Sequence, residues 1–145
     1  MIKKKYFVGA VGVGAILLIA IQFVPYGHDH TNPPVVEKPK WDRQQTRGLA
    51  VRACFNCHSN QTEWPWYSNI APTSWLVQYD VEQGREQMNL SRWDEPQRNA
   101  RKAPQFIESG EMPKWYYVLL HPEARLSPEE RQALAQGWKA TLSNR

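Results

Sequence analysis

A chain of 145 residues has room for one ordinary domain with an appendage, but not for two. Its formal net charge is +4, yet Lys3, Lys4 and Lys5 lie together at the start, and the remaining charges of both signs are closely mixed. The sequence therefore lacks the basic stripe of a nucleic-acid-binding module, and we expect no nucleic-acid partner.

The chain begins with an apolar segment, predicted to span residues 1–24. After the three lysines, Gln22 is the only strongly polar residue between Phe7 and Val24. A helix of about 18 residues is about 27 Å long, close to the roughly 30 Å hydrocarbon core of a bilayer. A cleaved signal peptide has a shorter apolar stretch followed by small residues at the cut site, and that site is missing here. We therefore expect a retained, single-pass transmembrane helix.

The next segment, residues 25–40, contains four prolines and few apolar side chains, which predicts an extended, semi-rigid linker. His28 and His30 lie in it, and we expect both to be solvated because a metal site needs three or four ligands. Positive charge before a span holds the N-terminus in the cytoplasm. We therefore expect the chain after Val24 to lie on the far side of the cytoplasmic membrane, in the periplasm or on the outer face.

Residues 41–145 are predicted to form one folded domain. Asp42 is placed to cap a helix that runs up to the two cysteines, and Gln45 completes a capping-box pattern three residues later. Gly48 lies in the middle of this helix. Because glycine has no side chain, we predict that Gly48 lets the helix cross close to Trp138 near the end of the chain.

The two cysteines of the chain are separated by two residues and followed directly by a histidine, in Cys54-Phe55-Asn56-Cys57-His58. Covalent attachment of haem uses two thiols at the spacing of the vinyl groups, with an adjacent histidine that binds the iron. We therefore predict one covalently attached haem c. Cys54 and Cys57 would form the two thioether bonds, and His58 would be the proximal iron ligand.

Three other interpretations of the cysteine pair are weaker. A structural zinc site needs four ligands, and the sequence offers no second metal-binding pair. A thiol-disulfide exchange site normally lies in a strand-helix-strand context, whereas the patterns here are helical or proline-rich. A structural disulfide across two residues would close a very small loop and contribute little stability. Thiol exchange without haem remains the second interpretation of this motif.

A tryptophan-rich run, WPWYSNIAP at residues 64–72, predicts a rigid loop. The carbonyl of Pro65 or of Pro72 is the expected acceptor for the proton on Nδ1 of His58, a contact that orients an iron-binding ring. A helix should begin just after this loop, at Thr73 or Ser74. Its apolar residues expected to face inward are Trp75, Leu76 and Tyr79.

Two further helices are predicted in the second half of the chain. One should begin at Asp94 and Pro96 and end near Gly110, with a kink or a shortening at Pro104. The other begins at Ser127, where a capping serine, a proline and a glutamate follow the order of a capping box. The residues expected on the buried face of this last helix are Leu134, Trp138 and Leu142.

A second iron ligand decides between an electron carrier and a protein with an open iron. Met112 lies between a glycine and a proline, in a stiff loop that suits a weak ligand, and it is the expected distal ligand. His121 precedes a proline in another loop and is the alternative, although a lone loop histidine is usually solvated. Met88 lies in a helical stretch, where methionine more often packs in the core.

Four segments together resemble the bacterial haem-binding-domain family, a set of small membrane-anchored proteins with one CxxCH motif. They are HTNPPV at 30–35, CFNCHSN at 54–60, WPWYSNIAP at 64–72 and GEMP at 110–113. The resemblance implies an all-α, cytochrome-c-like domain around one covalent haem, and covers nearly all the chain from Pro25 onward. A more distant similarity to class I cytochromes c carries over Cys54, Cys57, His58 and Met112.

The leading hypothesis is therefore a mono-haem c-type cytochrome, an electron carrier rather than an enzyme. It would pass single electrons between redox protein partners outside the cytoplasm, while the N-terminal helix lies in the lipid bilayer. Histidine and methionine ligands together favour a raised reduction potential. The alternative is a haem-based sensor or a small peroxidase, in which the sixth ligand is absent or displaceable and only His121 is available as a distal acid-base group.

Overall fold

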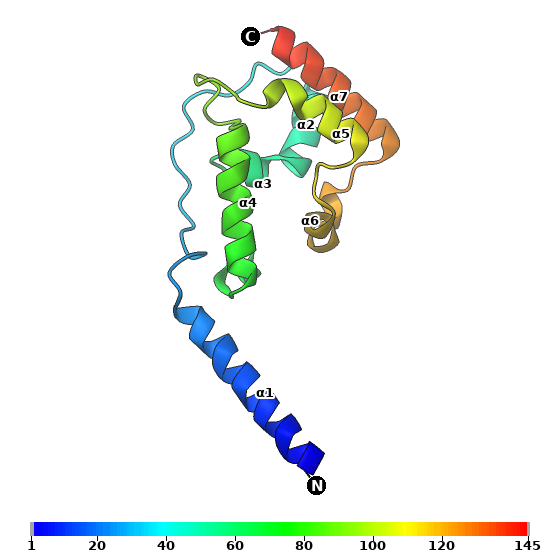
Figure 1. Cartoon of the computed structure of the whole chain (residues 1–145). Helices are drawn as coiled ribbons and strands as arrows, with labels where there is room; N and C mark the ends of the chain where they lie inside the picture. The colour runs from blue at the N-terminus through cyan, green and yellow to red at the C-terminus, as the bar shows by residue number, and fades with distance from the viewer. Residues whose placement is uncertain (1, 145) are drawn as a thin grey trace. The chain divides into compact units, whose positions relative to one another are not determined.

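The computed structural model describes residues 2–144, with side chains from Tyr6 onward, and the named secondary-structure elements in that range are all helices (Figure 1). An isolated parallel bridge between Glu37 and Arg92 is the only β-type pairing among the described residues. The all-α class is therefore confirmed. The helices are α1 (Ile2–Ala20), η1 (Ile21–Phe23), α2 (Gln44–Ala53), α3 (Phe55–His58), η2 (Trp66–Asn69), α4 (Thr73–Gln87), η3 (Ala100–Lys102), α5 (Ala103–Ser109), α6 (Trp115–Leu120), η4 (Pro122–Ala124) and α7 (Pro128–Ser143).

The chain divides into two compact units. The first consists of Met1–Thr31 and Trp64–Asp80, and the second of Asn32–Glu63 and Val81–Arg145. In the first unit, Tyr6–Phe23 has a mean hydropathy of 2.2 and is long and apolar enough to cross a membrane. This is the segment for which the sequence predicts a transmembrane helix.

Helix α4 begins at Thr73, as predicted, but a different face of it is buried. Leu76 and Tyr79 are exposed, and the buried positions near the start of the helix are Ser74 and Gln78. The physical reason is a close backbone approach: a Cβ on Gly27 would lie 2.7 Å from Oγ of Ser74. Trp75 is half-buried and its Cδ1 would lie 2.8 Å from the same Cβ, so it packs at this approach as predicted, whereas the inward placement of Leu76 and Tyr79 is wrong.

The second unit has its core around α7, and the shorter helix α5 packs beside it (Figure 1). Trp138 is fully buried there, and its Nε1 donates a hydrogen bond of 2.9 Å to the carbonyl of Ala100. The predicted capping box is confirmed, because the Ser127 side chain accepts from the backbone of Glu130 and the Glu130 side chain accepts from the backbone of Ser127. The buried residues of this core are Leu49, Ala50, Ala53, Phe55, Met88, Leu90, Trp93, Ala100, Ile107, Leu126, Leu134, Ala135 and Trp138.

Helices α2 and α7 cross closely at a glycine, but not at the predicted one. A Cβ on Gly48 would meet no atom within 4 Å, whereas a Cβ on Gly137 would overlap Oγ1 of Thr46 and lie 2.8 Å from its Cγ2. The prediction for Gly48 is therefore wrong. At this crossing the glycine belongs to α7, and the side chain that it approaches, Thr46, belongs to α2.

Two predicted helix starts are also wrong. Helix α2 begins after Arg43, which is its N-cap without a side-chain bond, because Asp42 lies one residue too early and its carboxylate is bound by the Arg43 guanidinium. The helix expected from Asp94 is instead a set of turns followed by η3 and α5. Pro104 lies in the first turn of α5, where a missing N–H costs no helical hydrogen bond, so it starts the helix rather than kinking it.

The second half of the predicted linker is hydrogen-bonded within the second unit. Backbone N–H groups of Val36 and Glu37 both donate to the carbonyl of Ser91, and the N–H of Trp93 donates to the carbonyl of Glu37. Nδ2 of Asn32 donates to the carbonyl of Thr62 at 2.9 Å, and the N–H of Thr62 donates to Oδ1 of Asn32 at 3.3 Å. This part of the chain is therefore a bound strap rather than a free spacer, and the boundary at residue 40 stays a prediction.

Candidate functional site

The Cys-x-x-Cys-His motif lies at a bend between two helices. Helix α2 ends at Ala53, Cys54 is its C-cap, and the short helix α3 carries Cys57 and His58. The backbone N–H of His58 donates to the carbonyl of Cys54 at 2.9 Å, so one turn of helix holds the three residues together. Both cysteines are half-buried. As the sequence predicts, the preceding helix leads directly into the motif.

The ring of His58 is oriented by the end of α4. Its Nδ1 lies 2.8 Å from the carbonyl oxygen of Gly84 and 3.2 Å from that of Met88. Because both neighbours are acceptors, the proton is assigned to Nδ1, and Nε2 carries the lone pair that a metal needs. Carbonyls at a helix C-terminus also carry partial negative charge, which increases the basicity of the ring.

The predicted acceptors, the carbonyls of Pro65 and Pro72, are therefore replaced by those of Gly84 and Met88. The prediction placed the acceptor in the loop that follows the motif in sequence. The structure takes it instead from the end of α4, where the carbonyl of Gly84 also accepts the backbone N–H of Met88 at 3.0 Å. The contact joins positions 26 residues apart.

Gly84 is a functional position that the sequence analysis missed. A Cβ at this position would overlap the carbonyl oxygen of Cys57 and lie 2.7 Å from its carbonyl carbon. Only glycine therefore allows α4 to approach the backbone of the motif closely enough to bind His58. A signal was present, because a glycine inside a helix costs about 1 kcal/mol relative to alanine and usually has a packing reason.

A second missed residue is Arg85, which binds the segment that follows the motif. Its Nε donates to the carbonyl of Ser59 at 2.9 Å, and its Nη2 donates to Oγ1 of Thr62 at 3.1 Å. The same nitrogen donates to Oδ1 of Asn32 at 2.8 Å. The guanidinium thus joins α4, the segment after His58 and the strap that begins at Asn32.

Helix α6 lies against the motif through one polar contact. Nδ2 of Asn56, between the two cysteines, donates to Oη of Tyr117 at 2.8 Å. Every residue of α6 is apolar or aromatic, yet none is buried. A helix of this composition normally lies against an apolar surface. Its half-buried residues are Tyr116, Tyr117 and Val118.

The two methionine candidates have different environments. Met88 is buried in the core of the second unit, as its helical position predicts, and it contributes its backbone carbonyl to His58. Met112 is half-buried and follows Gly110, the left-handed C-cap of α5 at φ +80°. The N–H of Met112 donates to the carbonyl of Phe106 at 3.0 Å, which ties its loop back to α5.

His121 is more ordered than a solvated loop histidine. Its ring stacks on that of Tyr117, with centroids 4.3 Å apart, and its Nδ1 lies 3.0 Å from Oε1 of Glu123. His30, in the first unit, is likewise held: it stacks on Trp64 at 4.5 Å, and its Nε2 lies 3.1 Å from the carbonyl of Ser68. The expectation that these histidines are solvated is therefore wrong for both.

Burial, with a smaller contribution from the neighbouring Cys57, raises the pKa of the Cys54 thiol to about 12. The thiol is therefore protonated at neutral pH. A cysteine that exchanges disulfides needs the opposite, a thiolate stabilised near neutral pH. The environment of Cys54 thus disfavours the thiol-exchange interpretation.

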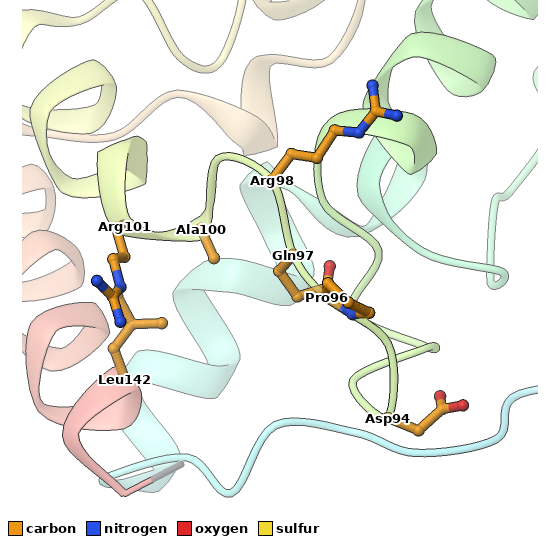
Figure 2. A pocket seen from close by; sticks show the side chains of 7 residues that line it. All are labelled: Asp94, Pro96, Gln97, Arg98, Ala100, Arg101 and Leu142. Carbon is orange, nitrogen blue, oxygen red and sulfur yellow. The ribbon is translucent and has the colours of Figure 1, made fainter.

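A separate hollow of about 630 Å³ lies between the loop before α5 and the end of α7. In Figure 2 its charged side chains do not converge: Arg98 and Arg101 point in opposite directions, and Asp94 points away from both. Arg98 is bound by Glu86 at 2.9 Å. The hollow therefore offers no built binding site.

The second unit is thus a small helical protein that brings two cysteine thiols and an imidazole held through Nδ1 together at one bend. The apolar helix α6 is joined to the same bend by the bond between Asn56 and Tyr117. The donor set fits a haem. The family model described as haem-binding domain matches residues 16–140, and the chain belongs to this family. No curated protein and no solved structure matches the chain.

Proposed function

We propose that this protein is a mono-haem c-type cytochrome that transfers single electrons outside the cytoplasm. The observation that carries the proposal is the pair of backbone carbonyls on Nδ1 of His58, which leave Nε2 for iron in a ring that directly follows the two-cysteine motif. Cys54 and Cys57 would hold one haem c by thioether bonds, and His58 would be its proximal ligand. The haem supplies the one-electron iron couple.

Met112 is the proposed distal ligand. The bond from its N–H to the carbonyl of Phe106 restricts the loop that carries it, which suits a weak thioether ligand. Histidine and methionine ligands favour a raised potential, so the electron acceptor would be a high-potential redox protein. Residues 41–145 would form a cytochrome-c-like domain, and the second half of the preceding linker, residues 25–40, would be hydrogen-bonded to it.

Residues 1–24 would be a retained anchor in a bacterial cytoplasmic membrane. The apolar segment Tyr6–Phe23 supports this anchor, and the lysines before it support an N-terminus in the cytoplasm. The haem domain would then lie in the periplasm or on the outer face.

The attachment is tested on protein made together with a cytochrome maturation system. The expected result is a mature mass that includes one haem, and a denatured pyridine haemochrome spectrum of the two-thioether type. Cys57→Ser should leave little haem on stained denaturing gels. Ser109→Ala, an exposed hydroxyl change outside the motif, is the matched control. A mature chain without the added mass, in cells that mature another c-type cytochrome, would refute the proposal.

The distal ligand is tested by spectroscopy on the same material. The ferric protein should show a sulfur-to-iron charge-transfer band, and the reduced protein should not bind carbon monoxide. Met112→Ala should abolish the band and permit binding. Rapid carbon monoxide binding to the unchanged protein, and to Met112→Ala at the same rate, would contradict the assignment.

A haem-based sensor or small peroxidase is the second candidate, and the ordered state of His121 supports it. Its Nδ1 faces Glu123 and its ring stacks on Tyr117, so Nε2 is held in a defined direction. A carboxylate on one nitrogen is a common way to orient a histidine for ligation or proton transfer. Carbon monoxide binding to the reduced, unchanged protein, together with a peroxidase rate that falls in His121→Ala but not in Met112→Ala, would favour this candidate.

A further inference from the structure

The apolar N-terminal helix is hydrogen-bonded to the tryptophan-rich loop in the first unit. Nε2 of Gln22 donates to the carbonyl of Ala71 at 2.9 Å, and the N–H of Ala71 donates back to Oε1 of Gln22 at 2.9 Å. The one strongly polar side chain of the apolar segment is thus used to hold the backbone of the loop. This contact lies at the C-terminal end of the segment, next to Phe23.

A second contact holds the same two parts of the first unit together. Gly27 adopts φ +94°, and a Cβ there would lie 2.7 Å from Oγ of Ser74 and 2.8 Å from Cδ1 of Trp75. The chain that leaves α1 therefore passes tightly against the first turn of α4. Together with the Gln22 pair, this contact fixes the loop at residues 64–72 beside the end of the apolar segment.

Large apolar side chains are exposed on this loop and on the chain segment held beside it. Trp66 is 75 % exposed and Ile70 is 47 % exposed, while Phe23 is 82 % exposed and Tyr26 is 43 % exposed. No charged side chain occurs in the sequence from residue 64 to residue 79, nor from residue 6 to residue 28. We call these four side chains, Phe23, Tyr26, Trp66 and Ile70, the collar.

We propose that the collar inserts into the interfacial layer of the bilayer at the point where α1 leaves it. The inference rests on the proposed function, because it requires α1 to be a retained transmembrane helix. Lipid is the occupant because Gln22 fixes the loop to the last turn of that helix, at the depth where hydrocarbon meets headgroups. Tryptophan and tyrosine are enriched at that depth, where an apolar ring and a polar N–H or O–H are both satisfied.

The collar would restrict the start of α4. A single transmembrane helix leaves the following chain free to rotate and tilt, whereas a second contact with the interface removes part of that freedom. Because Ser74 and Trp75 belong to the first turn of α4, this turn would be held close to the membrane surface.

The test uses the full haem-containing chain, labelled with fluorotryptophan, in nanodiscs of phosphatidylethanolamine and phosphatidylglycerol. Fluorine NMR is recorded on the reduced protein, with a spin label on the lipid near the headgroup or with a water-soluble gadolinium chelate. Trp66→Phe and Trp115→Phe assign the two resonances. Trp115, on α6, is 74 % exposed and is the matched control.

The expected result is loss of the Trp66 resonance with the labelled lipid and its persistence with the gadolinium chelate. Gln22→Leu keeps the helix apolar but removes both bonds to Ala71, so Trp66 should regain exposure to the chelate. Gln61→Leu makes the same chemical change at an exposed position and should leave the Trp66 resonance as it was.

Loss of the Trp66 resonance with the chelate, to the extent expected for an exposed ring in water, would overturn the inference. An unchanged resonance in Gln22→Leu would overturn the role of Gln22. Mass spectrometry of the chain purified from membranes shows whether residues 1–24 are retained, and so separates these results from cleavage of the anchor. A chain that lacks residues 1–24 refutes both the retained anchor and the insertion of the collar. An intact chain with a water-exposed Trp66 refutes the insertion of the collar alone.

Discussion

The Nδ1 atom of His58 lies 2.8 Å from the carbonyl oxygen of Gly84. The bond links the proposed iron ligand to a helix that comes later in the chain, and it exists only because the two backbones are close. The absence of a side chain at Gly84 permits this approach, since a Cβ there would lie 2.7 Å from the carbonyl carbon of Cys57. The glycine therefore acts as a positioning residue for His58.

Replacing Gly84 by alanine should separate α4 from the motif and lengthen the bond to His58. Overpacking of this kind typically costs about 1–3 kcal/mol of folding free energy. Denaturant unfolding of the haem-containing protein should show that loss. Its reduction potential should also shift, because the carbonyl on Nδ1 tunes the basicity of the ligand.

Gly48→Ala is the matched control, since Gly48 also lies inside a helix but a Cβ there would meet nothing within 4 Å. Its expected effect is a gain of about 0.5–1 kcal/mol, from the higher helix propensity of alanine. Equal effects of the two substitutions, or an unchanged potential in Gly84→Ala, would contradict the positioning role.

The features that the sequence predicts well are those whose chemistry lies within a few consecutive residues. The capping box at Ser127 and Glu130 is one example, and the start of α4 at Thr73 is another. The helix that leads directly into the Cys-x-x-Cys-His motif belongs to the same class. Each depends on local spacing, which the sequence states directly.

The contacts that the sequence does not predict join distant parts of the chain. The acceptor for His58 is a helix-terminal carbonyl 26 residues away, and a backbone carbonyl has no residue-specific signature. The helix crossing was assigned to Gly48 instead of Gly137 for a related reason. The sequence shows that a glycine lies in a predicted helix, but it does not show which neighbouring helix that glycine faces.

Gly137→Ala should destabilise the crossing of α2 and α7. The added methyl group would overlap Oγ1 of Thr46 and lie 2.8 Å from its Cγ2, within the core. The expected loss is about 1–3 kcal/mol in the free energy of unfolding. Combining it with Thr46→Ala, which removes both of these atoms, should recover part of the loss in a double-mutant cycle. Purely additive effects would show that Thr46 is not the group that collides.

The pair Arg52 and Glu130 should make stability depend on acidity below pH 5. The Arg52 guanidinium lies 2.7 Å from Oε2 of Glu130 and, with the backbone N–H of Ser127, holds the pKa of that carboxyl below its ordinary value of 4.5. A lowered pKa in the folded state stabilises the protein above the unfolded pKa. That stabilisation is lost as the pH falls through the lowered value.

Glu130→Gln keeps an acceptor for the backbone of Ser127 but has no charge to lose. The melting temperature of the unchanged protein should therefore exceed that of Glu130→Gln at pH 7, and the difference should shrink as the pH falls below 4.5. In an Arg52→Gln background, the pH dependence of this difference should be weaker. A difference that stays constant from pH 7 to pH 3 would contradict the ion-pair contribution.

The hydrogen bond between Asn56 and Tyr117 should stabilise α6 against the motif. Tyr117→Phe removes Oη, the acceptor of the 2.8 Å bond from Nδ2 of Asn56, but keeps the ring that stacks on His121. The expected cost is about 1 kcal/mol in the free energy of unfolding, the usual net value of one such bond. Asn56→Ala should remove the same contact, so the two effects should be less than additive in a double-mutant cycle. Tyr79→Phe, at an exposed position on α4, should be neutral. Full additivity would show that the two side chains act independently, and α6 would then depend on its apolar residues alone.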